Sequence, residues 1–416
     1  MARRVVITGM GLVSPLGNTL EESFAAAFAG QSGIRRCDQY LWGEYGEKIP
    51  IRVAGTVQNF DPSKYVEPKF VDRYDPCLSF ALAATQEALN DANIDFTNEL
   101  RDRTGVLIGT AVTGCTSWHK CFHMIFVQKR AHEIPGYLLM QMSGNMPSGI
   151  VALNHKFRGP NLAIVNACAT SGTTIGIASD YIRYGRSDVI VTGAVEAAIS
   201  PAMYGSLTNL RAINPTTDPI RASKPFSADR AGLVKGEGCG IIILESLDQA
   251  KARGARIYGE ILGDCQTNDA YHIISPEPTG ENWARTIRLA IESSGIGIND
   301  VDYISAHAAS TLLGDLTETK AIKSVFGKRA YDIPVTASKS MHGHAFGATG
   351  ALELILALKG MQEDKVIPTI NLTMPDPECD LDYIPNVGRT AKANVLLKNS
   401  FGFGGTNSCM VIRKGA

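Results

Sequence analysis

One cysteine stands in a setting that suits nucleophilic catalysis. Cys168 lies in the segment Asn166-Ala-Cys-Ala-Thr-Ser-Gly172, after the apolar run Leu162–Val165 and before a helix predicted over Thr173–Arg183. At a helix N-terminus, free backbone N–H groups and the helix dipole favour the thiolate. The small neighbours leave room for a substrate, and N–H groups of such an elbow can bind an oxyanion. We therefore expect Cys168 to be the nucleophile, whereas the ordinary buried, structural role is expected for Cys37, Cys77, Cys239, Cys265 and Cys409.

Two histidines are candidate partners of this cysteine. His307 follows the strand-like run Val301–Ile304, and His344 follows the run Ile333–Thr336. Both therefore stand at the carboxyl ends of predicted strands, where α/β folds place their ligands. A single histidine in such a place is more often a loop or core residue, but two of them with a cysteine in the same kind of position predict an active site.

His342 could be mistaken for the catalytic partner in place of His344, which is two positions away. The small-residue stretch Gly343–Gly350 puts His344 nearer to the start of the following helix.

A glycine-rich segment near the C-terminus has two interpretations. Asn399-Ser-Phe-Gly-Phe-Gly-Gly-Thr-Asn407 follows the predicted strand Ala393–Leu397 and precedes a terminal strand over Cys409–Ile412. Its glycines allow positive φ and could expose backbone N–H groups as an anion-binding nest. The alternative is an ordinary glycine-rich hairpin.

The pair Gly9 and Gly11 imitates the start of a dinucleotide-binding fingerprint. Ser14 occupies the position where that motif needs a third glycine for close packing of helix and strand. We expect a glycine-rich turn after the first strand, and not an oxidoreductase.

Short apolar runs alternate with helix-length segments along the chain, which predicts an α/β fold with sheets covered on both faces. The order of strand, small-residue elbow and helix at Leu162–Asp180 recurs at Ile333–Leu358. We therefore predict a pseudo-duplicated fold with a site between two halves and a hinge over Ser246–Arg256. The further strands are predicted over Val5–Thr8, Gly105–Gly109, Val189–Val191 and Gly240–Leu244, and the further helices over Leu78–Asn93, Trp283–Ser293 and Gly350–Leu358.

The composition excludes several classes of protein. The 416 residues carry 40 Lys and Arg against 41 Asp and Glu, so the net charge of −1 gives no global attraction to nucleic acid or to a membrane surface. No apolar run approaches the length of a membrane span, and the N-terminus lacks the features of a secretory signal. The nine cysteines are scattered and never spaced as CxxC. We expect reduced thiols, a cytoplasmic location and no metal site.

Taken together, these motifs resemble the β-ketoacyl-acyl-carrier-protein synthases of type II, within the thiolase-like superfamily. The order Cys168, His307, His344 is the specific signal, because initiating condensing enzymes use Cys–His–Asn and degradative thiolases use a second cysteine. The resemblance runs end to end, including the segments Val5–Gly17, Ser223–Phe226, Gly236–Gly238, Pro368–Leu372 and Asn399–Asn407. It implies a five-layered αβαβα sandwich, with an N-terminal half over residues 1–250 that carries the cysteine and a C-terminal half over 251–416 that carries the histidines.

The resemblance also implies roles for individual residues. Cys168 would accept an acyl chain from the phosphopantetheine of an acyl carrier protein, with an oxyanion hole formed by the N–H groups of Cys168 and Phe403. His307 and His344 would stabilise the enolate left when malonyl-carrier protein loses CO₂, and attack of that enolate would give a β-ketoacyl product two carbons longer. The other roles implied are Lys339 and Phe403 in catalysis and gating, Thr311, Leu207, Val112, Phe401 and Gly404 in substrate binding, and Glu353, Asp315 and Glu318 in support. No cofactor beyond the carrier's phosphopantetheine is implied.

Several positions depart from the family pattern. Ala308 and Ala309 follow the first histidine where Gly and Thr are usual. The family has two threonines that contact the pantetheine arm, and only Thr311 remains of them here. His342 replaces a threonine, Asn166 a Thr or Ser, and Leu207 a common aromatic along the acyl pocket. The segment Cys115–Met146 is rich in Cys, His, Met and aromatic residues, which we expect to serve interface packing more than zinc binding.

Two pathways remain open for such a synthase. One is fatty acid elongation by a homodimer, and the other is the catalytic ketosynthase subunit of a type II polyketide synthase, paired with a chain-length-factor homologue. A non-catalytic subunit is disfavoured because Cys168, His307 and His344 are all present. A cysteine hydrolase is disfavoured because nothing supplies the carboxylate or amide that orients a single histidine. The acidic carrier protein is expected to dock on basic residues, with Lys64, Lys69, Arg73, Lys129 and Arg130 as candidates.

Overall fold

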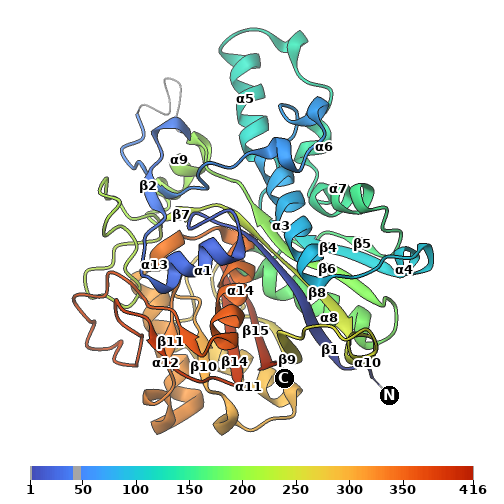
Figure 1. Ribbon diagram of the computed structural model, residues 1–416. Helices are drawn as coiled ribbons and strands as arrows, with labels where there is room; N and C mark the ends of the chain where they lie inside the picture. Colours follow the sequence, from blue (N-terminus) through green and yellow to red (C-terminus); the bar gives the residue numbers. More distant parts are fainter. Residues whose placement is uncertain (1, 41–47, 416) are drawn as a thin grey trace.

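The computed structural model describes residues 2–40 and 48–415, and a mixed sheet of ten strands runs through it (Figure 1). The strand order is β11-β10-β14-β15-β9-β1-β8-β6-β4-β5. These strands are β1 (Val5–Val13), β4 (Thr104–Gly109), β5 (Asn161–Leu162), β6 (Val189–Glu196), β8 (Gly238–Ser246), β9 (Gly259–Asn268), β10 (Tyr303–Ser305), β11 (Val335–Thr336), β14 (Val395–Gly402) and β15 (Thr406–Lys414). Two small sheets join β2 (Ile34–Arg36), β3 (Val53–Gly55) and β7 (Lys235–Gly236), and β12 (Lys365–Val366) with β13 (Arg389–Thr390).

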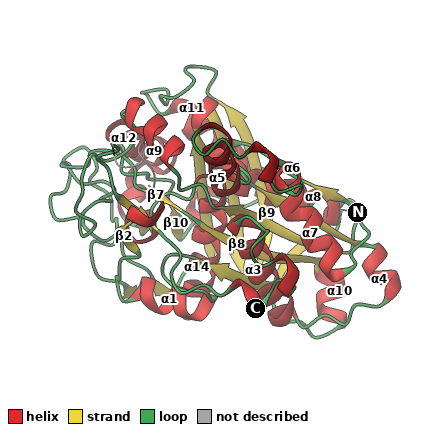
Figure 2. Ribbon diagram, turned by 90° about the horizontal axis from the view of Figure 1, so that it is seen from above, coloured by secondary structure: helices red, strands yellow, loops and turns green. Residues whose placement is uncertain are grey.

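The helices cover both faces of the large sheet (Figure 2). They are α1 (Leu20–Phe28), α3 (Pro76–Ala92), α4 (Asn98–Asp102), α5 (Cys115–Phe126), α6 (Leu138–Met142), α7 (Met146–His155), α8 (Thr170–Arg183), α9 (Pro201–Asn209), α10 (Leu247–Ala252), α11 (Glu281–Ser294), α12 (Leu312–Phe326), α13 (Lys339–His342) and α14 (Thr349–Gln362). Local chemistry sets their ends. For example, the Asp75 carboxylate accepts the Cys77 N–H at the start of α3, and Asn93 ends it in the left-handed region at φ 48°.

The topology confirms the pseudo-duplication. The first half runs β5-β4-β6-β8-β1 and the second half β11-β10-β14-β15-β9, with two parallel pairings followed by two antiparallel ones in each. The two halves are joined where Val5–Ile7 of β1 pairs with residues 259–261 of β9. Helices α3 and α7 pack on the first half, α11 and α12 cover the second, and α8 and α14 lie between the two. This is the predicted five-layered αβαβα sandwich.

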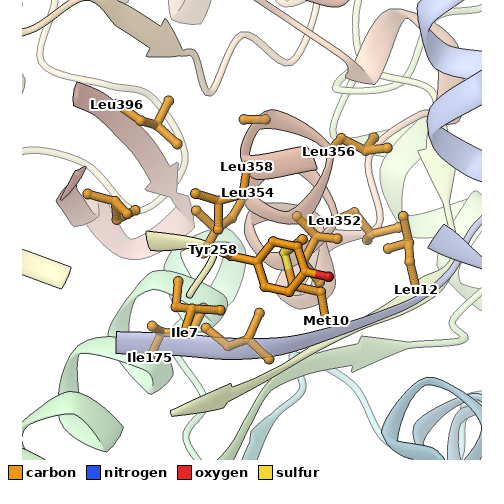
Figure 3. Close-up of a cluster of buried hydrophobic side chains, with 14 of the residues drawn as sticks. Ile7, Met10, Leu12, Ile175, Tyr258, Leu352, Leu354, Leu356, Leu358 and Leu396 are labelled. Atoms are coloured by element: carbon orange, nitrogen blue, oxygen red, sulfur yellow. The ribbon is translucent and has the colours of Figure 1, made fainter. Parts of the chain in front are cut away.

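The centre of the molecule is the helix α14, which is buried along most of its length. Four of its leucines are 0–1% exposed, and they pack between β1 and β14, with α8 beside them (Figure 3). Apart from Glu353 and Lys359 its side chains are mainly apolar, and a helix of this kind belongs inside a protein, here between the two layers of strands. The labelled members of this cluster are Ile7, Met10, Leu12, Ile175, Tyr258, Leu352, Leu354, Leu356, Leu358 and Leu396.

Gly9 and Gly11 do not form the turn expected from the sequence, because β1 continues through both to Val13. A Cβ atom on Gly9 would lie 2.3 Å from the Ala88 carbonyl oxygen, and one on Gly11 would lie 2.0 Å from that of Ala84. The two glycines therefore allow α3 to pack directly on the backbone of β1.

The run before the cysteine was also wrongly predicted as a buried strand. Only Asn161–Leu162 is extended as β5, at the edge of the sheet, and Val165 is 63% exposed. Hydrophobicity alone does not distinguish a central strand from an edge that is exposed in a single chain.

The expected hinge over Ser246–Arg256 contains the helix α10, and the four predicted helices that fall in α3, α8, α11 and α14 are confirmed to within a few residues. None of the helices in residues 2–40 and 48–415 has the length and apolar character needed to cross a membrane.

Candidate active site

A cavity of about 350 Å³ opens between the two halves, and Cys168, His307 and His344 all lie on its wall. Its outer part is lined by Arg211, Ser275, Leu313 and their neighbours, and its inner part by apolar side chains such as Phe401 and Phe346. Three reactive side chains from three separate segments thus share one pocket, as predicted, although the strand expected directly before Cys168 is absent.

The segment before α8 holds Cys168 in a tight elbow. Cys168 lies in the 3₁₀ turn Ala167–Ala169, directly before α8, and Ala167 adopts a positive φ of 46°. The β14–β15 hairpin closes on this elbow, since a Cβ on Gly402 would lie 2.9 Å from the Cys168 backbone nitrogen. The glycine-rich segment is therefore both the ordinary hairpin and part of the active site, because its close approach requires glycine.

His344 touches the cysteine directly. Its Nε2 lies 3.1 Å from Cys168 Sγ, and its Nδ1 lies 2.9 Å from the Thr349 hydroxyl at the start of α14. Its backbone N–H donates to the Val234 carbonyl at 2.7 Å. Both the ring and the backbone of His344 are thus held in place.

His307 is held through the backbone around it. Glu318 on α12 accepts the N–H groups of His307 at 2.8 Å and Ala308 at 2.7 Å, and also the Asn399 side-chain amide at 3.0 Å. The imidazole rings of His307 and His344 meet edge to face with centroids 5.4 Å apart. One buried carboxylate therefore joins the His307 loop to β14.

A buried ion cluster lies behind the histidines. Glu353 on α14 contacts the Lys339 ammonium and the Lys398 ammonium, each at 2.8 Å, and all three side chains are at most 4% exposed. Lys339 also donates to the His307 carbonyl. Burial raises the pKa of Glu353, but the two ammonium groups outweigh burial and leave its pKa below the ordinary value.

Burial also sets the protonation of the reactive groups. It lowers the pKa of His307 and of His344 well below the usual value, and the Lys339 ammonium lowers both further. Both imidazoles are therefore neutral near pH 7. Burial raises the pKa of the Cys168 thiol to about 11, and Lys339 and the Phe403 backbone N–H oppose this rise only in part.

Two family models match most of the chain. Residues 2–250 match the β-ketoacyl synthase N-terminal domain and residues 258–373 match the β-ketoacyl synthase C-terminal domain. The chain belongs to the β-ketoacyl synthase family. It is 41% identical over 413 residues to 3-oxoacyl-[acyl-carrier-protein] synthase 2 of Synechocystis sp., and 38% identical over 412 residues to the protein of that name in Staphylococcus aureus. Each alignment covers 99% of this chain and 98% of the relative.

Solved structures of β-ketoacyl synthases have the same fold. A type II polyketide synthase ketosynthase, in complex with its acyl-carrier protein and bound to the hexaketide, superposes with a TM-score of 0.91 at 35% identity and full coverage of both chains. The ishigamide ketosynthase/chain length factor gives 0.91 at 30% identity with full coverage, and a β-ketoacyl synthase from Burkholderia phymatum gives 0.90 at 32%, covering 99% of each chain.

The residues singled out from this synthase's sequence fall into two groups. Cys168, His307, His344, Thr311, Phe401 and Phe403 line the cavity, and Lys339, Glu353, Asp315 and Glu318 are buried behind it. Asp315 accepts the N–H groups of Phe226 at 2.9 Å and Thr311 at 3.3 Å. Gly404, at φ 81°, lies beside Phe403, whereas Leu207 and Val112 do not reach the cavity. As expected, His342 is not part of the cavity wall, and its Nε2 lies 2.9 Å from the Ser338 hydroxyl.

Several residues of this synthase's site were not singled out from the sequence. Lys398, Thr349 and Trp283, which stacks on Phe401 with ring centroids 3.9 Å apart, gave no local signal. Glu196 and Lys235 are buried close to Cys168, and both contribute to its pKa. Glu196 and Lys235 could have been found from the sequence, because each is a charged residue among apolar or small neighbours and burying a charge is costly unless another group compensates it.

The cysteine- and histidine-rich segment forms the helix α5, where Cys115 and Cys121 are buried. In the part of the chain that the structure describes, no group of three or more His, Cys, Asp or Glu side chains is arranged to hold a metal ion.

The raised pKa of Cys168 predicts the pH dependence of its alkylation. Below about pH 11 the buried thiol is protonated, so the rate of iodoacetamide labelling of Cys168 should rise about tenfold per pH unit between about pH 7 and pH 9. Peptide mass spectrometry after short exposures measures this rate, and Cys239, which is 0% exposed, reports any unfolding by becoming labelled. A profile that levels off below about pH 8 would show that the helix N-terminus outweighs burial.

Proposed function

We propose that this chain catalyses a decarboxylative Claisen condensation in fatty acid elongation, as its relatives' name, 3-oxoacyl-[acyl-carrier-protein] synthase 2, indicates. An acyl group on Cys168 would condense with malonyl-acyl carrier protein to give CO₂ and a β-ketoacyl-acyl carrier protein two carbons longer. The observation that carries the proposal is the convergence of Cys168, His307 and His344 on one cavity, with Sγ and Nε2 3.1 Å apart.

In the first half-reaction, Cys168 Sγ attacks the thioester carbonyl of the acyl-carrier protein. The pantetheine sulfur leaves and receives the thiol proton, so the acyl group ends on Cys168. The tetrahedral oxyanion would be stabilised by the backbone N–H groups of Cys168 and Phe403. The close packing of Gly402 on the Cys168 backbone nitrogen, which brings these two segments together, supports this assignment. Contact with His344 Nε2 offers the thiol proton a path at the moment of attack.

In the second half-reaction, the two neutral imidazoles stabilise an enolate. The malonyl C–C bond breaks, CO₂ leaves, and the remaining electron pair is shared with the thioester oxygen. Accepting the thiol proton in the first half-reaction needs the tautomer with its hydrogen on Nδ1. In the other tautomer the Thr349 hydroxyl donates to Nδ1 of His344, and Nε2 carries the hydrogen and can donate to the enolate oxygen. His307 would give the second hydrogen bond. The enolate carbon then attacks the acyl carbonyl, and Cys168 leaves as the thiolate.

Lys339 would be a positioning residue in this reaction. It donates to the backbone carbonyl of His307 and pairs with Glu353, so it orients the histidine without touching the substrate. Glu318 and Asp315 would act in the same way on the loop from His307 to Thr311. Phe403 would also control access to the acyl side of Cys168.

Both substrates would arrive on the phosphopantetheine arm of an acyl carrier protein. Thr311 and the apolar Leu313 lie along the outer cavity and suit contact with that arm, and the exposed Arg211 at the mouth suits an acidic carrier. No other cofactor is proposed, and a cytoplasmic location remains a prediction. The solved ketosynthase in complex with its acyl-carrier protein supports this choice of partner.

A dimer is proposed through the edge of the sheet at β5. Leu162 is 39% exposed and Val165 is 63% exposed, and α5 presents Phe122 at 41% and Phe126 at 67%. An apolar sheet edge and exposed aromatic side chains are each typical of a surface covered in an assembly. The dimer would be a homodimer in fatty acid elongation.

A second candidate function is the catalytic ketosynthase subunit of a type II polyketide synthase, paired with a chain-length-factor homologue. It is favoured by the two solved polyketide-type structures that superpose over the full chain, one of them a ketosynthase/chain length factor.

The test uses the purified full chain with an acyl-carrier protein, followed by malonyl-carrier protein and intact mass spectrometry. The expected result is an acyl adduct on Cys168 and then a carrier-bound product extended by two carbons. Condensation that requires a co-purified homologue would favour the polyketide subunit. Absence of an acyl adduct with and without a homologue would contradict the proposed function.

A further inference from the structure

A buried lysine next to the active site has no part in the mechanism above. Lys235, in β7, is 0% exposed and its ammonium donates to the Gly236 carbonyl at 2.8 Å. Among the described residues, the carboxylates of Glu196 and Glu237 act on it through their charge and without a side-chain hydrogen bond. An ammonium without an ion pair is costly to bury, so its position calls for a compensating contact.

That contact is the ring of Phe346. The Lys235 nitrogen lies over the ring, 4.0 Å from its centroid, and the edge of His344 meets the same ring at 5.4 Å between centroids. A cation over an aromatic face is attracted by the ring's quadrupole, and most strongly where water is excluded. The Phe346 ring is therefore held between Lys235 and His344.

The backbone of Phe346 is fixed independently of its ring. Phe346 has a positive φ of 42°, which L-residues rarely adopt. The next residue, Gly347, donates its N–H to Glu196 at 3.1 Å and accepts a hydrogen bond from the Ser171 hydroxyl. The remaining freedom of Phe346 is therefore the rotation of its side chain, on which Lys235 acts.

Phe346 connects the cavity with apolar side chains that do not line it. Phe346 lines the cavity and belongs to one buried cluster with Cys168, Leu207, Tyr204 and Ile199, but Leu207 does not reach the cavity. Gly347 packs on Ala111, where an added Cβ would lie 2.7 Å from the Ala111 nitrogen. A long acyl chain on Cys168 would need the space that the ring fills.

We propose that Lys235 and Phe346 are a specificity-determining pair, which holds the acyl side of Cys168 closed and favours short aliphatic acyl groups over long ones. This inference rests on the proposed function of Cys168 as the acyl acceptor. A short acyl group fits between Cys168 and the ring, whereas a longer chain has to displace the ring from Lys235 before it reaches Leu207.

The test compares acylation of the full chain by acetyl- and octanoyl-carrier protein, measured as kcat/KM from the mass of the Cys168 adduct. The wild type should prefer acetyl. Lys235→Leu should raise the octanoyl-to-acetyl ratio about tenfold, the scale of one desolvated cation–π contact. Because Lys235 also acts on the Cys168 thiol, both rates can change together, and the ratio removes that common effect.

A second variant keeps the test decisive if Lys235→Leu does not fold. Phe346→Ala removes the ring, leaves Lys235 in place and should raise the same ratio at least as much. The double variant should match Phe346→Ala alone, since Lys235 acts through the ring. Lys365→Leu is the matched control, because the Lys365 ammonium lies 5.0 Å from the Phe28 ring centroid away from the cavity, and its ratio should stay that of the wild type.

The outcomes separate this inference from the proposed function. If the wild type forms both adducts but shows no chain-length preference, or if the ratio is unchanged in Lys235→Leu and in Phe346→Ala, the pair does not set specificity and the inference is overturned. If no carrier-bound acyl group modifies Cys168 in the wild type, the proposed function itself fails.

Discussion

Replacing Cys168 by alanine should eliminate acylation and lower the rate of condensation by at least about 10³-fold, because the reaction then has no acyl acceptor. Decarboxylation of malonyl-carrier protein should survive in this variant, since it depends on His307 and His344 and on none of the sulfur's chemistry. The Cys168→Ala variant is also expected to fold, because it removes one atom, the sulfur, whose polar contacts are the His344 ring and the Phe403 backbone N–H.

Three measurements check this prediction on the same protein preparation. Intact mass reports the acyl adduct, release of CO₂ reports decarboxylation, and the mass of the carrier protein reports condensation. The matched control is Cys265→Ala, because Cys265 lies on β9 and does not line the cavity. An adduct of undiminished amount on Cys168→Ala would identify another nucleophile. Loss of decarboxylation together with acylation would show that the cysteine and the histidines do not act in separate steps.

The second large effect is expected at Glu353, which neutralises two buried ammonium groups. Glu353→Gln keeps the shape of the side chain but leaves Lys339 and Lys398 without an anion, and both are at most 4% exposed. Breaking a buried ion pair by removing one partner typically destabilises a protein by about 3–5 kcal/mol, because the remaining charge is left uncompensated. We expect a free energy of unfolding lower by about that amount, together with a lower kcat, because Lys339 holds the carbonyl of His307.

The chain offers a close control for this variant. Glu363 also contacts two lysines, Lys359 at 3.1 Å and Lys365 at 2.7 Å, but its side chain is 32% exposed. Water solvates those charges after the substitution, so Glu363→Gln should change the free energy of unfolding by less than about 1 kcal/mol. Urea unfolding of both variants measures the difference. Equal losses in the two variants would contradict the role assigned to burial.

The three side chains that meet in the cavity could be predicted from the sequence because each carries a local signal. Cys168 stands among small residues before a helical pattern, and His307 and His344 each follow an apolar run, so strand-end placement is readable without knowing the fold. The helix α14 was also predicted, over Gly350–Leu358, whereas its burial between the two halves became apparent only in the structure. The repeated order of strand, elbow and helix likewise predicted the duplicated sheet.

Other features could not be predicted, because they depend on contacts between distant segments. Gly9 and Gly11 looked like a turn, and only the approach of α3 shows that they belong to a continuous strand. The second ammonium group that pairs with Glu353 belongs to Lys398, which lies 45 residues later in the sequence. The run Leu162–Val165 has the composition of a central strand, but only Leu162 belongs to the edge strand β5 and Val165 is 63% exposed, because the same composition suits a central strand and an exposed edge.

The sequence by itself therefore determined the reactive groups, the strand ends that carry them and the duplicated order of elements, because these follow from residue type and periodicity along the chain. The tertiary structure alone decided the protonation of those groups and the shape of the space around them. Burial makes His307 and His344 neutral and raises the pKa of the Cys168 thiol. Packing of β7 against the segment after His344 places Lys235 over the ring of Phe346. Desolvation and packing depend on which segments meet in space, so no local pattern of residues specifies them.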